Sequence, residues 1–124
     1  MGAASSREIK YRGYKLLLHS LSPILKDDRI LICGPVLFEI KRGLRPPDRK
    51  KILPLFDALI RLSVDETVWD AAGDLDALLR KNGITIPPMD VIIAQICLHH
   101  KVAIFTLDEH FHSIPGLKFF ELRS

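Results

Sequence analysis

The sequence predicts one α/β domain over residues 1–124, with a mainly parallel sheet flanked by helices. Short apolar runs typical of buried strands alternate along the chain with longer segments whose apolar residues recur at helical spacing. Such alternation is typical of layered α/β folds. Apolar residues make up 48% of the chain and charged residues 27%, which excludes a disordered chain. A chain of 124 residues builds one sizeable core and is too short for two.

The first elements are expected to be a helix, a strand and a second helix. Four leucines recur at helical spacing: Leu17, Leu18, Leu21 and Leu25. Their spacing predicts an early helical hairpin or a kinked helix. Residues 29–33 form an apolar run typical of a buried strand, and Gly34-Pro35 marks a turn. Pro35 suits the first position of a helix that runs to Gly43.

The middle of the chain is predicted to be helical. Residues 48–62 have apolar residues at helical spacing, with Pro54 either kinking or beginning the helix. This leaves residues 63–64 for a very short strand. Asp65 is a good N-cap for the next helix, which Asn82-Gly83 ends. Its core face is predicted to hold Val68, Trp69, Ala72, Leu75 and Leu79.

The last third of the chain is predicted to contain one helix and two strands. A helix is expected over residues 89–100, after two prolines. Residues 102–106 and 117–122 are apolar runs that predict two strands. The strands therefore alternate with helices to the end of the chain.

The sequence has the features of neither a membrane-spanning nor a secreted protein. No apolar run approaches the roughly 20 residues that cross a bilayer, because Asp57, Asp70 and Gln95 interrupt the best candidates. The first residues lack a secretory signal, and Cys33 and Cys97 have no metal-type spacing, so we expect a cytoplasmic protein. The net charge of +3 permits a polyanionic partner without requiring one.

Three carboxylates occupy positions where acids are unusual. Glu39 shares the buried face of the helix expected over residues 35–43. Asp90 leads three apolar residues at spacings of three, four and seven: Ile93, Ala94 and Cys97. Asp108 directly follows an apolar strand, where ligand sites of parallel sheets collect. An unpaired buried carboxylate is expensive, so each needs a cation, a metal or hydrogen bonds.

These acids predict a shared site for a divalent ion. Oxygen ligands in this number suit Mg²⁺ or Mn²⁺, which can bind a phosphate and activate water. Ordinary roles remain open for two of them, since Asp108 could cap a helix near Glu109 and Asp90 could serve a first helical turn. Glu39, in mid-helix, has no capping role.

The three acids lie in three sequence motifs. The first motif, ILICGPVLFEIKRG at 30–43, resembles the second strand and following helix of VapC-type toxins of the PIN domain family, with Glu39 at the acidic position. The sequence DVIIAQ at 90–95 resembles the central aspartate motif. The sequence TLDEHF at 106–111 resembles the last acidic motif, with Asp108 as the ligand and Thr106 beside it. Each motif alone is weak, while their order and spacing make the combination specific.

The resemblance implies a PIN-like sheet flanked by helices and a ribonuclease that hydrolyses RNA phosphodiester bonds. It implies catalytic and metal-binding roles for Glu39, Asp90 and Asp108, with Mg²⁺ or Mn²⁺ as the cofactor. It further implies a toxin–antitoxin pair, in which a small antitoxin protein covers the site of the toxin, and a homodimer.

The N-terminus departs from this pattern. Such toxins open with an apolar strand that ends in an aspartate motif, followed by a helix containing Arg-Gly. Aligning Arg12-Gly13 with that dipeptide puts the aspartate position near Ala3, so residues 1–13 are an atypical segment and the first strand is missing or replaced. Residues 8–11 alternate in polarity and are a candidate replacement. We also expect a strand and an aspartate to be encoded upstream of Met1.

A chain without the first aspartate has a second interpretation. It could be a catalytically impaired PIN-like remnant that binds an antitoxin or RNA. A phosphoacceptor receiver domain is a distant third, because its paired acids after the first strand and its lysine after the fifth are not evident.

Other residues have two interpretations each. A basic run lies close to Glu39: Lys41, Arg42, Arg45, Arg49, Lys50 and Lys51. It could hold an RNA backbone through phosphate contacts, or be a solvated surface loop. His110 and His112 could supplement Asp108 as zinc ligands, but no second pair of ligands is evident, so local surface roles are predicted.

Overall fold

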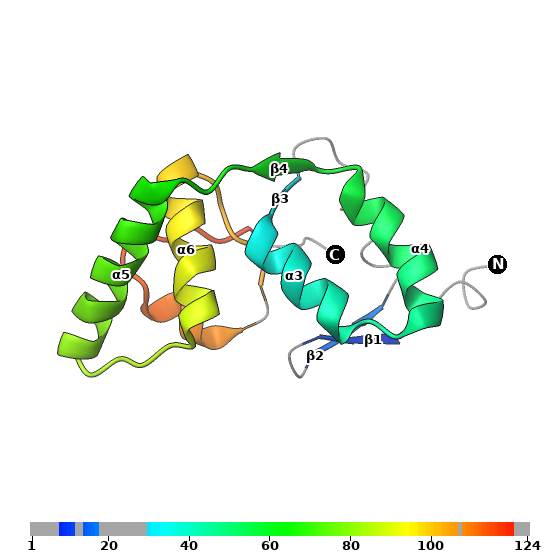
Figure 1. Cartoon of the computed structure of the whole chain (residues 1–124). Helices are drawn as coiled ribbons and strands as arrows, with labels where there is room; N and C mark the ends of the chain where they lie inside the picture. Colours follow the sequence, from blue (N-terminus) through cyan, green and yellow to red (C-terminus); the bar gives the residue numbers. More distant parts are fainter. Residues whose placement is uncertain (1–7, 12–13, 18–29, 107, 121–124) are drawn as a thin grey trace. The chain divides into compact units, whose positions relative to one another are not determined.

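The computed structural model describes residues 8–11, 14–17, 30–106 and 108–120. The chain divides into two compact units, Met1–Leu62 and Ser63–Ser124 (Figure 1). The fold is a mixed α/β one, as the alternation of apolar patterns predicts. Among the described helices, none is long and apolar enough to cross a membrane.

The first unit contains a parallel strand pair with a helical connection. β3 (Leu31–Cys33) pairs with β4 (Ile60–Leu62), and the chain between them forms α3 (Gly34–Gly43) and α4 (Pro46–Asp57). Parallel strands need such a crossover, because a tight turn joins only antiparallel neighbours. The buried apolar residues come from β3 and both helices: Ile32, Cys33, Leu37 and Ile52.

The strand and helix expected on either side of Gly34 are confirmed. Pro35 lies in the first turn of α3, where its fixed φ suits the helix and its missing N–H is no loss. At the other end of α3, the guanidinium of Arg49 donates a hydrogen bond to the carbonyl oxygen of Lys41 at 2.7 Å. That carbonyl has no partner within the helix, so Arg49 ties the start of α4 to the end of α3.

The prediction for residues 48–64 is wrong at both ends. α4 begins at Pro46, because two successive prolines suit a first turn, and it contains Pro54 without ending there. It stops at Asp57, and the strand lies at Ile60–Leu62 rather than at residues 63–64. The backbone groups of β4 pair with β3, and this tertiary pairing overrides the helical spacing of the apolar residues.

The N-terminal strands form an antiparallel pair. β1 (Glu8–Tyr11) pairs with β2 (Tyr14–Leu17). A strand at residues 8–11 agrees with their alternating polarity, but its described partner is β2, and it does not pair with β3 or β4. The helix predicted from Leu17 onward is wrong at that residue, which ends β2, because short apolar runs do not distinguish strand from helix. The remainder of that prediction, in residues 18–29, lies outside the described residues.

In the second unit, two helices pack side by side (Figure 1). They are α5 (Glu66–Lys81) and α6 (Pro88–His100), followed by the short 3-10 helix η1 (Glu109–Ser113). The buried apolar residues come from both helices and the segments around them: Val68, Ala72, Leu79, Ile86, Val91, Ile93, Ala94, Ile96, Cys97, Ile104, Phe111, Ile114 and Leu117.

Both predicted ends of α5 are confirmed. The carboxylate of Asp65 accepts a hydrogen bond from the backbone N–H of Val68 at 3.2 Å, and so satisfies a free donor of the first turn. Gly83, with φ of 77°, turns the chain out of the helix, and the N–H of Ile84 donates to the carbonyl of Leu79 at 2.8 Å. A positive φ is accessible to glycine without steric cost, so Gly83 suits this stop.

The core position predicted for Trp69 is wrong. Its side chain is 47% exposed, whereas Val68, one residue earlier, is fully buried. The inward face of α5 is defined by Val68, Ala72 and Leu79, and consecutive residues of a helix are turned by about 100°. Trp69 therefore lies outside the buried face of α5, next to Val68, which is part of it.

The last two predicted strands share less pairing than expected over their described residues, and residues 121–122 of the second lie outside the described residues. The only described pairing within 102–106 and 117–120 is a single parallel bridge between Ile104 and Phe119. The N–H of Ile104 donates to the carbonyl of Lys118 at 2.9 Å, and the N–H of Phe120 donates to the carbonyl of Ile104 at 2.8 Å. These two segments share too few described hydrogen bonds to form a longer ladder.

The cap of α5 gives a test of this fold. We expect Asp65→Ala to lower the free energy of unfolding by about 1 kcal/mol, because the N–H of Val68 loses its acceptor. Urea unfolding followed by circular dichroism measures the change. The control is Asp74→Ala, an exposed acid within the same helix, for which a change below about 0.5 kcal/mol is expected. Equal losses in the two variants would contradict the capping role.

Candidate metal centre

Asp90 is placed by the first turn of α6. Pro87 and Pro88 begin the helix, and Asp90 follows on the face that also carries Ile93 and Ala94. The side chain of Asp90 has 0% exposure. This agrees with the apolar spacing around it. The backbone N–H groups of a first turn give a favourable electrostatic setting for a carboxylate.

Asp108 is placed by the turn into η1. It occupies the N-cap position of η1, but its side chain makes no capping hydrogen bond there. Its backbone N–H donates to the hydroxyl oxygen of Thr106 at 3.0 Å, which fixes the turn locally. The capping role considered for Asp108 is therefore not the one its carboxylate has in the structure.

His110 lies between these two carboxylates. Its Nε2 is 2.6 Å from Oδ2 of Asp90, and its Nδ1 is 2.7 Å from Oδ1 of Asp108. The contact with Asp90 is a hydrogen bond, and the contact with Asp108 is at ion-pair distance. The ring also stacks on Phe111, with centroids 5.0 Å apart, and Phe111 is buried.

The chemistry of these three side chains fits a divalent metal ion. One potential ligand atom from each of Asp90, Asp108 and His110 lies within 4.8 Å of the others. Two ligands at about 2.1 Å from one ion are at most about 4.2 Å apart, so small side-chain shifts are sufficient to share an ion. Carboxylate oxygen and imidazole nitrogen are both established ligands of divalent ions.

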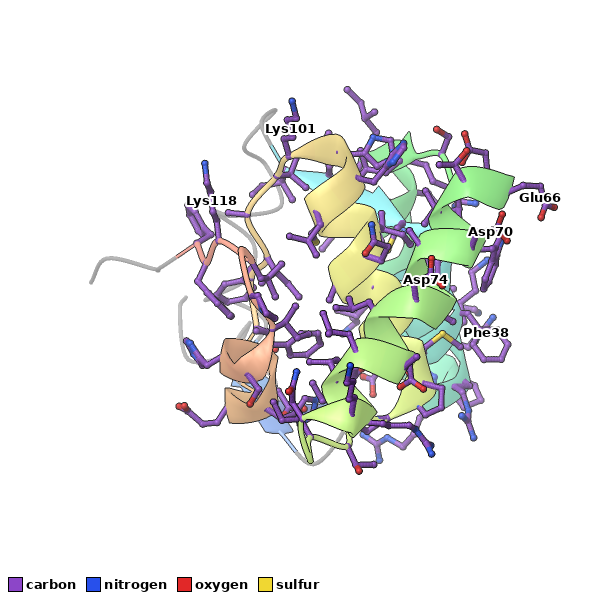
Figure 2. The ribbon with its side chains drawn as sticks, turned by 90° about the vertical axis from the view of Figure 1, so that its left-hand side faces the viewer. Phe38, Glu66, Asp70, Asp74, Lys101 and Lys118 are labelled. Carbon is purple, nitrogen blue, oxygen red and sulfur yellow. The ribbon has the colours of Figure 1, made fainter. Side chains whose placement is uncertain are left out.

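Other acids of the second unit differ from this cluster. Figure 2 shows Glu66, Asp70 and Asp74 on the surface of α5, where each is exposed to solvent. An exposed acid keeps its hydration and needs no compensation, whereas the buried carboxylate of Asp90 does. Burial thus separates Asp90 from the acids that only make the surface polar.

Cysteine chemistry has no favourable setting among the described residues. Cys33 and Cys97 are both buried, and neither forms a disulfide bond. Burial raises the pKa of the Cys33 thiol, and a hydrogen bond with the backbone of Val36 only partly opposes this effect. The uncharged thiol is a poor nucleophile and a weak metal ligand, so Cys33 serves as a core residue.

Comparison with known proteins identifies the family. The PIN domain matches residues 6–117, which is most of the chain. The chain belongs to the PIN domain family. Among solved structures, a chain of VapBC2 from Rickettsia felis, bound to a DNA fragment from its promoter, has a TM-score of 0.62 at 21% identity. The match covers 82% of this chain and 81% of that one, and it shows a shared fold. The search of curated proteins found no match.

The resemblance read from the three PIN motifs is thus confirmed at the level of family and fold. The structure brings together two of the three predicted acids of this PIN domain, Asp90 and Asp108. Glu39 is half-buried on α3 in the first unit, so its convergence with the aspartates stays a prediction.

The basic run spans the end of α3 and the start of α4. Two of its members have partners in the structure: Arg49 bonds to the carbonyl of Lys41, and Arg45 lies 3.5 Å from the carboxylate of the buried Asp48. Arg45 is itself exposed, and so are four further side chains of the run: Lys41, Arg42, Lys50 and Lys51. These four are the members best placed to meet a polyanion.

The local surface role predicted for His110 is wrong, because its ring contacts both Asp90 and Asp108. It is 20 residues from Asp90, and no helical or strand period links positions at that separation. Its distance of two residues from Asp108 is the only local signal, because a 3-10 turn can bring such neighbours together.

The contact between Asp90 and His110 gives a second test. In the presence of a chelator, a double-mutant cycle with Asp90→Asn and His110→Asn should give a coupling energy of about 0.5–3 kcal/mol in unfolding experiments. The reason is that each change removes one partner of the 2.6 Å contact.

A matched cycle uses Asp90→Asn with His112→Asn. The side chain of His112 is 57% exposed and stacks on Phe119, with centroids 4.1 Å apart. Additivity within about 0.5 kcal/mol is expected for that pair. Additivity in both cycles would show that the contact with His110 does not form in solution.

Proposed function

We propose that this PIN domain is a metal-dependent endoribonuclease of toxin–antitoxin type, and that residues 1–124 act as one domain in hydrolysing RNA phosphodiester bonds. The proposed metal ligands and catalytic residues are Glu39, Asp90 and Asp108, with Mg²⁺ or Mn²⁺ as the cofactor. The observation that carries the proposal is the meeting of Asp90 and Asp108, from segments far apart in sequence, in a chain of the PIN family.

Each residue has a role that follows from its position. Asp90 offers a carboxylate held rigidly in the first turn of a buried helix. Asp108 is 20% exposed, so its carboxylate can meet both the ion and a ligand from solvent. Thr106 positions Asp108 by accepting a hydrogen bond from its N–H. The ion, when bound, supplies positive charge that activates water and stabilises the charge developing on a phosphate.

RNA is the proposed substrate, held by the basic run of the first unit. The exposed cations of the run project from neighbouring helical turns of α3 and α4, close in sequence to Glu39. Exposed lysine and arginine side chains can contact phosphates without reading the bases. Such contacts position a backbone, while cleavage would depend on the acids.

A small antitoxin is the proposed protein partner. Support comes from the fold shared with a chain of VapBC2, together with the three VapC-like motifs. In this proposal the partner covers the acidic centre and blocks access of RNA. A homodimer and a cytoplasmic location, without attachment to a membrane, belong to the same proposal.

The nuclease proposal is tested with a single-stranded RNA and purified protein. We expect cleavage with Mg²⁺ or Mn²⁺ and none in a chelator. Asp90→Asn and Glu39→Gln are each expected to slow cleavage on the order of 100-fold, because each removes a charged ligand of the ion. The control is Glu66→Gln, which changes an exposed acid on α5 and should leave the rate unchanged.

Two results would overturn the nuclease proposal in different ways. Cleavage that persists in a chelator and in Asp90→Asn would point to a contaminating nuclease. Metal binding and RNA binding without cleavage would favour the second interpretation, a catalytically impaired PIN domain that binds RNA or an antitoxin.

The role of the basic run has a separate test based on salt. For a single-stranded RNA, each lost phosphate contact lowers the slope of log K against log salt by about 0.7. We therefore expect Lys50→Ala/Lys51→Ala to weaken binding and to reduce the slope by about 1.4. The control, Lys81→Ala/Lys118→Ala, removes two exposed lysines from the second unit and has the same net charge. Equal slopes in the two variants would leave the basic run without a specific role.

A further inference from the structure

We infer that His110 is itself a metal ligand, and that the Asp90, Asp108 and His110 centre binds a first-row transition ion such as Mn²⁺ or Co²⁺ in preference to Mg²⁺. The inference rests on the proposed metal site and specifies its ligands and its ion. From the sequence, His110 is a possible zinc ligand beside Asp108, but a surface role is predicted for it.

The geometry gives His110 the position of a ligand. Its two ring nitrogens lie within 2.7 Å of carboxylate oxygens from both predicted ligands. An ion that binds Asp90 and Asp108 therefore has a ring nitrogen within its reach. A nitrogen that binds the ion does so through its lone pair, so a bond to the ion replaces one of the two contacts with the carboxylates.

The ring is held where the ion needs it. His110 is 31% exposed, so the ring is mostly covered yet reachable from solvent. It stacks on Phe111, which is 3% exposed and anchors η1 in the core. A surface histidine would sample several rotamers, whereas this one is restrained by the stacked ring and by both carboxylates.

The donor set determines which ions are favoured. Mg²⁺ is a hard ion that prefers oxygen ligands and loses water reluctantly. Imidazole nitrogen suits first-row transition ions, whose affinities for such sites rise from Mn²⁺ to Co²⁺ and beyond. A centre with two carboxylates and one imidazole therefore favours these ions over Mg²⁺, whereas a purely acidic centre would not make this distinction through its ligands.

His112 is a matched control within the same short helix. It lies two residues after His110, but its Nε2 is 4.0 Å from Glu109, and its ring stacks on Phe119. Neither of its described partners is Asp90 or Asp108. His110→Asn and His112→Asn therefore make the same chemical change at positions that differ in their relation to the centre.

The test measures ion binding by the whole chain without RNA. Mn²⁺ binding is followed by electron paramagnetic resonance of the free ion, and Mg²⁺ is added as a competitor. We expect Mn²⁺ to bind at least about tenfold more tightly than Mg²⁺, and His110→Asn to reduce that preference by about tenfold. His112→Asn should leave both affinities unchanged. Circular dichroism establishes that each variant is folded.

A second measurement detects the bond to nitrogen directly. Pulsed electron paramagnetic resonance of bound Mn²⁺ should show coupling to an imidazole nitrogen in the wild-type chain and in His112→Asn. The coupling should disappear in His110→Asn. The variant His110→Asp, which supplies an oxygen ligand, should restore tight binding with a preference shifted toward Mg²⁺ and without the nitrogen signal.

The outcomes separate this inference from the proposed metal site. If Mn²⁺ binds, depends on Asp90 and is indifferent to His110→Asn, the imidazole is not a ligand and this inference is wrong while the site stands. If no divalent ion binds the folded wild-type chain, the proposed metal site and this inference both fail.

Discussion

The side chain of Asp90 is completely buried, and the residues packed around it must stabilise a carboxylate that has no access to water. Removing a carboxylate from water costs several kcal/mol unless charged or hydrogen-bonding groups take the place of its hydration shell. The first turn of α6 offers part of this replacement, and the ring of His110, at 2.6 Å, offers another part. The second unit therefore needs η1 to lie against the start of α6.

Core residues keep that contact in place. Phe111 and Ile114, in and just after η1, are both 3% exposed, so the segment that carries His110 is anchored by burial of apolar surface. Asp108 is fixed on the other side of His110 through the hydroxyl of Thr106. A rigid helix and a short turn anchored in the core hold the polar side chains more firmly than a free loop would. The apolar core and the polar centre thus depend on each other.

The two units offer different chemistry. The second unit holds the buried Asp90, the partly exposed Asp108 and the imidazole of His110, which together form the candidate metal centre. The first unit presents Glu39 on α3 and exposed cations at the junction of α3 and α4. The proposed hydrolysis of an RNA backbone would use both functions, since a polyanion must be held while charge on one phosphate is neutralised.

Local chemistry accounts for what the sequence alone determined. Asp65 and Gly83 set the ends of α5, because a cap and a positive φ depend only on neighbouring residues. The strand before Gly34, the helix after Pro35 and the buried position of Asp90 follow from short-range spacing in the same way. The PIN resemblance could likewise be read from three motifs in order.

Only the tertiary structure decided the features that depend on distant partners. The strand at Ile60–Leu62 exists because β3 pairs with it, and the helical spacing of its residues carries no trace of that partner. Trp69 is exposed because Val68, its neighbour, occupies the inward position. His110 joins Asp90 across 20 residues, through the path of the chain from α6 to η1. Periodicity records which face of an element is apolar, whereas contacts between elements depend on how the chain folds back on itself.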